Sequence, residues 1–362
     1  MSAVTTPVRD VTGGPALELR DLSVSFATPA GPVTAVDSVS LACGAGEVVG
    51  LVGESGCGKS TLARAAMGLL PGSASTTGQV LVQGRETAHL SAEEHRRLRG
   101  DVISMVVQDP GTSLDPTAGI GSQVAETVRA HRPVGRREAR RRAVTQLEAV
   151  GIHDAAQRYG DPPHRFSGGM RQRVVIAAAL VNSPAVLVAD EPTTALDVTI
   201  QAQVLDLVRT LCVDSGTAVL LITHDLGVVA QVCDRVAVMY AGQIIERAPA
   251  AELFREPRHP YTRALLGSLP SKDVPAGQLE VIPGQVPDLL DPPTGCRFAS
   301  RCAHRADVCE TRPPDVAVPA AGTGAGVGTG GTDTGAEVAC WLYVPGAHPE
   351  GFAASPRSGV AP

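Results

Sequence analysis

The sequence predicts an α/β protein organised around a mostly parallel β-sheet. From Val174 onward the hydrophobic pattern changes in turn from a helix to a strand (185–189), a second helix (200–213) and a second strand (218–223). This alternation is typical of a parallel sheet with helices on its faces. Earlier in the chain, a β-rich run at 47–52 leads directly into a glycine-rich segment, which predicts a strand that feeds a helix through a tight loop.

Length and composition favour a globular protein with one large domain and a smaller second part. The chain has 362 residues, of which 43% are hydrophobic and 19% are charged, and its formal net charge is -6. A negative net charge provides no basic field for nucleic acid, so no nucleic-acid partner is expected. The longest apolar runs, at 174–181 and 218–222, are much shorter than the roughly 20 residues that cross a bilayer. A membrane role would require partner subunits, and the cytoplasmic side is the expected location.

Further segments differ in character from the α/β core. Residues 1–15 have neither a basic nor an apolar signal region, which predicts a disordered leader. Residues 17–26 alternate apolar and polar side chains like a strand. The stretch 100–160 contains a basic run within a helical pattern, which predicts a helical subdomain. Prolines become frequent past residue 248, and 317–335 is almost entirely Gly, Ala, Thr and Val, which predicts a flexible loop.

A complete phosphate-binding loop follows the strand at 47–52. It matches G-x-x-x-x-G-K-[ST] and consists of Gly53, Glu54, Ser55, Gly56, Cys57, Gly58, Lys59 and Ser60, with Thr61 next. The glycines let successive N–H groups point at phosphate oxygens, and the following helix adds its positive N-terminal end. We therefore expect ATP here, with Lys59 on the β- and γ-phosphates, Ser60 on Mg²⁺ and Thr61 as a further donor. Cys57 is expected to act only as a small filler.

Two acids end the strand at 185–189 and predict a reaction centre. Asp190 and Glu191 follow a buried apolar run, where adjacent carboxylates require a cation. We expect Asp190 in the Mg²⁺ shell and Glu191 to polarise the attacking water, with His224 between Glu191 and the γ-phosphate. Taken alone, an Asp-Glu pair is a helix cap about as often as it is catalytic. A lone histidine is likewise structural about as often as it is catalytic. The phosphate loop upstream favours the catalytic reading of all three residues.

A second glycine-rich motif identifies a family resemblance. The segment Phe166–Arg173 reads Phe-Ser-Gly-Gly-Met-Arg-Gln-Arg and resembles the signature of ABC transporter nucleotide-binding subunits. Its core of Ser167, Gly168 and Gly169 offers a hydroxyl and free amides at a helix start, which form an anion site. The phosphate loop of the same chain already binds its own ATP, so this second anion site is expected to serve the ATP of another subunit. The resemblance implies two such domains head to tail, each ATP lying between one phosphate loop and the partner's signature.

The resemblance covers most of the chain and implies its architecture. It implies an ABC ATPase domain over residues 16–250, with a RecA-like mixed sheet, an antiparallel β subdomain and a helical subdomain at about 105–165. Residues 251–362 would form a small cysteine-rich C-terminal extension.

Three more positions match the family one at a time. Gln108 matches the Q-loop glutamine, which binds Mg²⁺ or water, and Asp197 matches the D-loop at the dimer seam. Phe26 lies where an aromatic ring would stack on adenine, although a buried strand aromatic is an equally good reading. The resemblance thus assigns Gln108 to catalysis and metal binding, and the other two residues to the nucleotide.

The stretch after the ATPase core resembles the oligopeptide and dipeptide importer branch. It contains His-Pro-Tyr-Thr-Arg-Ala-Leu-Leu at 259–266, and the signature is also similar to that of the D-type subunit. The resemblance implies an ATP hydrolase that energises peptide uptake. Its partners would be a homologous F-type ATPase, two transmembrane permease subunits and an extracytoplasmic binding protein. A nickel or glycoside importer remains an alternative, as does a soluble ABC ATPase not tied to transport.

Four late cysteines, Cys296, Cys302, Cys309 and Cys340, predict metal ligation in a tail that has little core of its own. Their spacing does not fit the close pairs of zinc ribbons or bacterial ferredoxins, so zinc and iron–sulfur both stay open. The resemblance implies a [4Fe–4S] cluster, because importer ATPases of this branch carry a C-terminal cysteine cluster. Zinc, with His304 as a further ligand, and unligated thiols are the alternatives.

Overall fold

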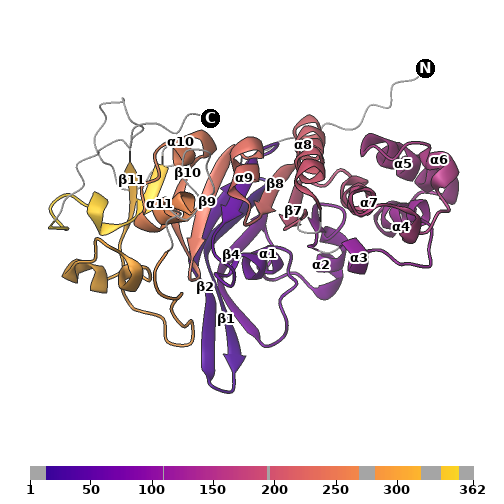
Figure 1. The fold of residues 1–362 in the computed structure, drawn as a ribbon. Coiled ribbons are helices and arrows are strands. Elements are labelled where there is room, and N and C mark those ends of the chain that lie inside the picture. Colours follow the sequence, from indigo (N-terminus) through magenta and orange to yellow (C-terminus); the bar gives the residue numbers. More distant parts are fainter. Residues whose placement is uncertain (1–13, 109, 194–195, 269–281, 319–335, 350–362) are drawn as a thin grey trace.

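The described strands form two sheets, and a group of helices lies at one end of the molecule. The computed structural model describes residues 14–108, 110–193, 196–268, 282–318 and 336–349. Figure 1 shows an elongated molecule in which the helices α4, α5 and α6 lie at one end and the described C-terminal residues at the other. The two sheets lie between these ends.

The larger sheet has eight strands in the order β11-β12-β10-β9-β3-β8-β7-β6. From β6 to β9 neighbouring strands are parallel, and β10, β12 and β11 continue the sheet in antiparallel pairing. The strands span β3 Val48–Val52, β6 Ile103–Val106, β7 Val186–Asp190, β8 Ala218–Ile222, β9 Arg235–Tyr240, β10 Gln243–Pro249, β11 Asp315–Val318 and β12 Ala336–Ala339.

The central strands are apolar on both sides because both faces of this sheet are covered. In β3, Val49 and Leu51 pack into one buried cluster, while Val48 and Val52 pack into the other. Successive side chains of a strand point to opposite faces, so an uninterrupted apolar run is what a doubly covered parallel strand requires. The strands therefore carry the two halves of the core and bring their polar C-terminal ends to one edge.

The smaller sheet is antiparallel, with the order β2-β1-β4-β5. Its strands are β1 Leu17–Thr28, β2 Gly31–Cys43, β4 Ala74–Val82 and β5 Arg85–Glu86. The expected strand at 17–26 is β1, whose buried side chains, such as Leu17 and Val24, share a cluster with the helix α1. This sheet is the antiparallel subdomain that the family resemblance implies.

The helices comprise a set near the sheets, a helical subdomain and short turns in the C-terminal region. They are α1 Lys59–Ala66, α2 Ala92–Leu98, α3 Pro110–Ser113, α4 Ile120–His131, α5 Arg136–Ala149, α6 Ala155–Arg158, α7 Gly168–Leu180, α8 Val198–Ser215, α9 Leu226–Val232, α10 Ala250–Arg255 and α11 Pro260–Gly267, with 3₁₀ turns η1 Pro163–Arg165, η2 Ala299–Arg301, η3 Asp307–Glu310 and η4 Trp341–Tyr343. Among the described helices, none combines the length and the apolar character required to span a bilayer.

The C-terminal region is less separate from the core than the sequence indicates. Its strand β12 pairs with β10, at Glu246↔Val338 and Arg247↔Glu337, and thereby extends the main sheet. Residues 317 and 318, which the sequence assigns to a flexible loop at 317–335, instead complete β11. The remainder of that loop, and the leader up to residue 13, lie outside the described residues.

Candidate functional site

The phosphate loop connects β3 to α1, and three of its glycines have positive φ, two of which lie against neighbouring backbone. Gly53 has φ 153° and Gly58 has φ 106°. A Cβ at Gly53 would lie 2.1 Å from the carbonyl oxygen of Met239, and one at Gly58 would lie 2.3 Å from that of Ala35. Only glycine allows this curl and this close approach. The motif is therefore folded as a loop that packs closely against the neighbouring backbone.

Lys59 is the first residue of α1 and is only 7% exposed. Its Nζ donates to the carbonyl oxygens of Gly53 and Glu54, both at 2.8 Å. It also lies 3.6 Å from the Sγ of Cys57, whose pKa is raised by burial. The ammonium is thus held over the mouth of the loop by the loop's own backbone. Cys57 fills space there, as the sequence predicts.

Ser60 and Asp190 join the phosphate loop to the end of β7. The hydroxyl of Ser60 donates to Oδ1 of Asp190 at 3.2 Å, although 130 residues separate them. Burial raises the pKa of Asp190, and the neighbouring charge of Glu191 raises it further, while the Ser60 hydrogen bond opposes the shift. A buried carboxylate in this position is stabilised by a cation. The pair fits a Mg²⁺ site at the place that the sequence predicts.

Two residues from separate segments, Gln108 and His224, meet at Glu191. Its Oε2 accepts a hydrogen bond from Nε2 of Gln108 at 2.8 Å, and its Oε1 lies 3.3 Å from Nδ1 of His224. The backbone of Glu191 has φ 46°, a conformation that non-glycine residues rarely adopt and that is common at functional sites. The His224 side chain is 64% exposed. The structure thus brings together the three residues that the sequence assigns to catalysis.

The signature motif forms the start of α7, away from α1. Ser167 is the N-cap, and its hydroxyl accepts a hydrogen bond from the N–H of Met170 at 3.3 Å. Gly169 packs closely on α8, since a Cβ there would lie 2.6 Å from Cγ2 of Ile200. In Figure 1, α7 lies with α4 and α5, and α1 lies beside the sheets. The exposed serine and the two glycines therefore lie away from the phosphate loop of their own chain.

Two remaining predicted residues occupy ordinary structural positions. Asp197 caps α8 by accepting a hydrogen bond from the N–H of Ile200 at 3.0 Å. Phe26 pairs with Val33 and Ala74 in the antiparallel sheet and is partly buried against its core. These contacts are compatible with either reading of Phe26.

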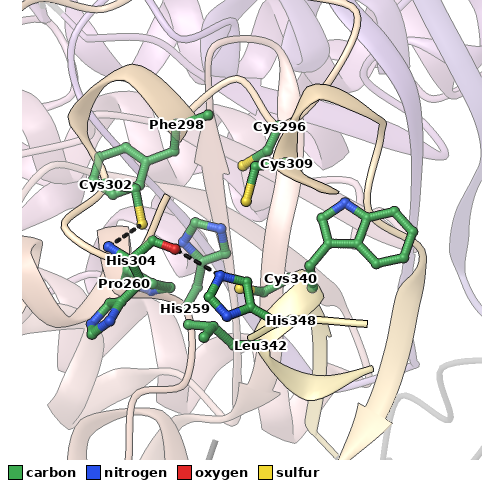
Figure 2. A pocket seen from close by; sticks show the side chains of 12 residues that line it. His259, Pro260, Cys296, Phe298, Cys302, His304, Cys309, Cys340, Leu342 and His348 are labelled. Carbon is green, nitrogen blue, oxygen red and sulfur yellow. Dashed lines mark hydrogen bonds between the residues drawn. The ribbon is translucent and has the colours of Figure 1, made fainter. Parts of the chain in front are cut away.

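The four late cysteines line one pocket, which is shown in Figure 2. The C-terminal thiols Cys296 and Cys309 lie side by side, and Cys302 and Cys340 approach from other sides. Burial raises the pKa of Cys296 to about 11 and that of Cys340 to about 12, and the neighbouring thiols add to both shifts. As they stand, the described residues contain no group of three or more Cys, His, Asp or Glu arranged to hold a metal ion. The donor set suits soft metals, but ligation would require the thiols to draw together.

Sequence reasoning missed contacts between the C-terminal region and the phosphate loop. The hydroxyl of Tyr261, in α11, accepts a hydrogen bond from the N–H of Glu54 at 3.0 Å. Tyr261, Tyr240 and Phe298 form an aromatic cluster with centroid distances of 4.7 to 5.5 Å. Arg301 also binds Glu54. No local motif marks such pairs, because more than 200 residues separate the partners.

Comparisons with known proteins decide the family. The family described as "ABC transporter" matches residues 36–194, and "Oligopeptide/dipeptide transporter, C-terminal region" matches residues 245–309. The dipeptide transport ATP-binding protein DppD of Bacillus subtilis is 49% identical over 296 residues, which are 81% of this chain and 88% of that protein. The oligopeptide transport ATP-binding protein OppD of Salmonella typhimurium is 47% identical, over 82% of this chain and 89% of that protein. The chain belongs to the ABC transporter family.

Solved structures of ABC proteins share the fold. The dimeric ATP-binding cassette MJ0796, in a post-hydrolysis state with ADP and Pi, has a TM-score of 0.58 and 26% identity. The match covers 65% of this chain and 98% of that one. A second ABC subunit, cbiO1 of Clostridium perfringens, also has a TM-score of 0.58 and covers 67% of this chain. The α/β fold with its two sheets and helical subdomain is therefore an ABC ATPase cassette, as the sequence predicts.

Proposed function

We propose that this chain is the ATP-hydrolysing subunit of an ABC importer that takes up oligopeptides or dipeptides at the cytoplasmic face of the membrane. The observation that carries the proposal is the joining of Ser60 to Asp190, and of Gln108 and His224 to Glu191, around one phosphate loop. The peptide assignment is supported by relatives with 45 to 49% identity that are named for oligopeptide or dipeptide transport.

The residues of the site divide the chemistry among themselves. Lys59 and the loop amides would bind the phosphates, with Thr61 as a further donor, and Ser60 and Asp190 would hold Mg²⁺, which supplies charge neutralisation at the β- and γ-phosphates. Glu191 would orient the attacking water and accept its proton. Gln108 and His224 would hold the Glu191 carboxylate in place, since both already contact its oxygens. His224 would also contact the γ-phosphate, and its 64% exposed side chain leaves one face open for this.

A second cassette would complete each site. Because Ser167, Gly168 and Gly169 lie away from their own phosphate loop, we assign them to the nucleotide of a partner, with Asp197 near the seam and Phe26 on adenine. The partner would be a homologous F-type subunit. Two permease subunits would form the membrane path, and an extracytoplasmic binding protein would select the peptide.

Reconstitution tests this function. The complex of this chain with its partner ATPase, permeases and binding protein should accumulate labelled di- or oligopeptides in proteoliposomes when Mg-ATP is present on the cytoplasmic side. Nickel or glycoside uptake without peptide uptake would support the runner-up importer instead. ATP hydrolysis that no permease stimulates would favour the soluble ABC ATPase.

We further propose that Cys296, Cys302, Cys309 and Cys340 hold a [4Fe–4S] cluster. Four thiols that line one pocket are the ligand set that such a cluster requires, and cluster or zinc binding would replace their protons. Zinc, with His304 beside Cys302, is the alternative. The family match at 245–309 includes three of these cysteines, and Cys340 joins them through η4 next to β12.

Metal analysis distinguishes these alternatives. Protein made and purified without oxygen should be brown and contain about four irons and four acid-labile sulfides per chain. One equivalent of zinc in colourless protein would replace the cluster by a zinc site. Metal-free protein with four titratable thiols would refute both assignments.

A further inference from the structure

A buried arginine of the C-terminal region binds the phosphate loop directly. Arg301 ends η2, and its side chain is only 5% exposed. Its Nη1 lies 3.2 and 3.1 Å from the two carboxylate oxygens of Glu54 and donates to the hydroxyl of Tyr240 at 3.2 Å. Its Nε donates to the carbonyl oxygen of Pro283 at 2.8 Å. The guanidinium is thus fixed to the C-terminal backbone on one edge while it holds Glu54 on another.

Glu54 is in turn one of the two residues, with Gly53, whose carbonyl oxygens hold the Lys59 ammonium. The N–H of Glu54 is bonded to Tyr261, its carboxylate to Arg301 and its carbonyl oxygen to Nζ of Lys59 at 2.8 Å. Two of these three attachments come from the C-terminal region. The position of the Lys59 ammonium therefore depends on a backbone segment that the C-terminal region holds from outside the ATPase motifs.

We propose that Arg301 is a positioning residue for ATP binding, which acts on Lys59 and the loop amides through Glu54. The inference rests on the proposed ATPase function. A charge-assisted contact with a largely buried guanidinium is stronger than a surface ion pair, and the bonds of Nε and Nη2 to the carbonyl oxygens of Pro283 and Ile282 fix the direction of Nη1. Without the contact between Arg301 and Glu54, the loop would have to be ordered when ATP binds, and the entropic cost of that ordering lowers the affinity for ATP.

A neighbouring arginine separates this role from simple attachment of the C-terminal region. Arg297 is equally buried, and its Nη2 donates to Asp37 of β2 at 2.7 Å without touching the phosphate loop. An exposed pair in the same region, Arg305 and Glu310 at 3.1 Å, provides a control for charge alone. Loss of either contact should leave the Glu54 linkage intact.

A double-mutant cycle on the full chain tests the proposal, with the Kd for Mg-ATP measured by calorimetry. Arg301→Gln should raise Kd about fivefold to tenfold, which is the effect of one charge-assisted hydrogen bond. Glu54→Ala should raise Kd by a similar factor, and the double variant should be no weaker than either single variant. Arg301→Lys retains the charge but cannot make the Nε and Nη1 contacts together, so its Kd should lie between those of the unaltered chain and of Arg301→Gln.

The controls define the contrary results. Arg297→Gln and Arg305→Gln should each change Kd by less than about twofold, even where Arg297→Gln lowers Tm. An unchanged Kd in Arg301→Gln, losses that multiply in the double variant, or an equal loss in Arg297→Gln would each overturn the proposal. If Arg301→Gln does not fold, Glu54→Ala decides, and an unchanged Kd there refutes the linkage. An unaltered chain that binds no ATP would refute the proposed function instead.

Discussion

Replacing Glu191 by glutamine should stop turnover while ATP binding persists. The carboxylate accepts from Gln108 at 2.8 Å and lies 3.3 Å from Nδ1 of His224. A glutamine has the same shape, its oxygen can accept from Gln108 and its amide can donate to His224 when Nδ1 is unprotonated. The neighbours therefore remain paired, and the variant loses the base for the attacking water. General base catalysis contributes about 10²- to 10⁴-fold, which corresponds to about 2.7 to 5.4 kcal/mol of transition-state stabilisation.

The assay compares phosphate release at saturating Mg-ATP with the Kd for ATP in the assembled importer. The expected result is a fall in kcat of about 100-fold or more with Kd within about threefold. Glu93→Gln is the matched control, because its carboxylate is 48% exposed and pairs only with nearby arginines of α2. Turnover of the Glu191 variant within about threefold of the unaltered importer would refute the assignment. A loss of affinity that accounts for the whole effect would show that Glu191 acts in binding.

Lys59→Ala should raise the Kd for ATP at least about 10-fold, because it removes the ammonium that neutralises the β- and γ-phosphates. An unchanged affinity measured by calorimetry would contradict this. The isolated chain should hydrolyse ATP slowly, because Ser167 would serve a partner's nucleotide. Full phosphate release by a chain that light scattering shows to be monomeric would contradict this. In metal-free protein the thiols at 296 and 340 should react slowly with iodoacetamide at pH 8, since their pKa values are about 11 and about 12. These folded pKa values exceed the pKa of roughly 8.5 of unfolded cysteine, so the free energy of unfolding should fall as the pH rises above about 9. A denaturation series in which this free energy stays constant or rises would contradict the burial of these thiols.

The ATPase core could be predicted from the sequence because its signals are local. The strand before the phosphate loop is β3, the strand before Asp190 is β7, and the strand before His224 is β8. In a parallel sheet the C-terminal ends of neighbouring strands lie at one edge, so residues far apart in sequence meet there by topology alone. The pairing of Ser60 with Asp190 follows from this rule.

The attachment of the C-terminal region could not be predicted, because it depends on single long-range contacts without a periodic pattern. The strand β12 has four residues and pairs with β10 at only two positions, Glu246 and Arg247. Glu246, 1% exposed, also accepts the N–H groups of Arg258 and His259 at 2.7 and 2.8 Å, and thereby fixes the start of α11. A sequence pattern shows that residue 246 is a glutamate in a strand, but not which amides it will bind.

The contacts of Glu246 also connect the C-terminal region to the nucleotide site. Glu246 fixes the start of α11, and α11 carries Tyr261 to the N–H of Glu54 in the phosphate loop. Charged groups that are buried with complete partners contribute orientation more than net stability. The region that holds the four cysteines is therefore joined to the nucleotide site by oriented polar contacts, and a change in the cysteine pocket that displaced Arg301 would reach Lys59 through a single residue, Glu54.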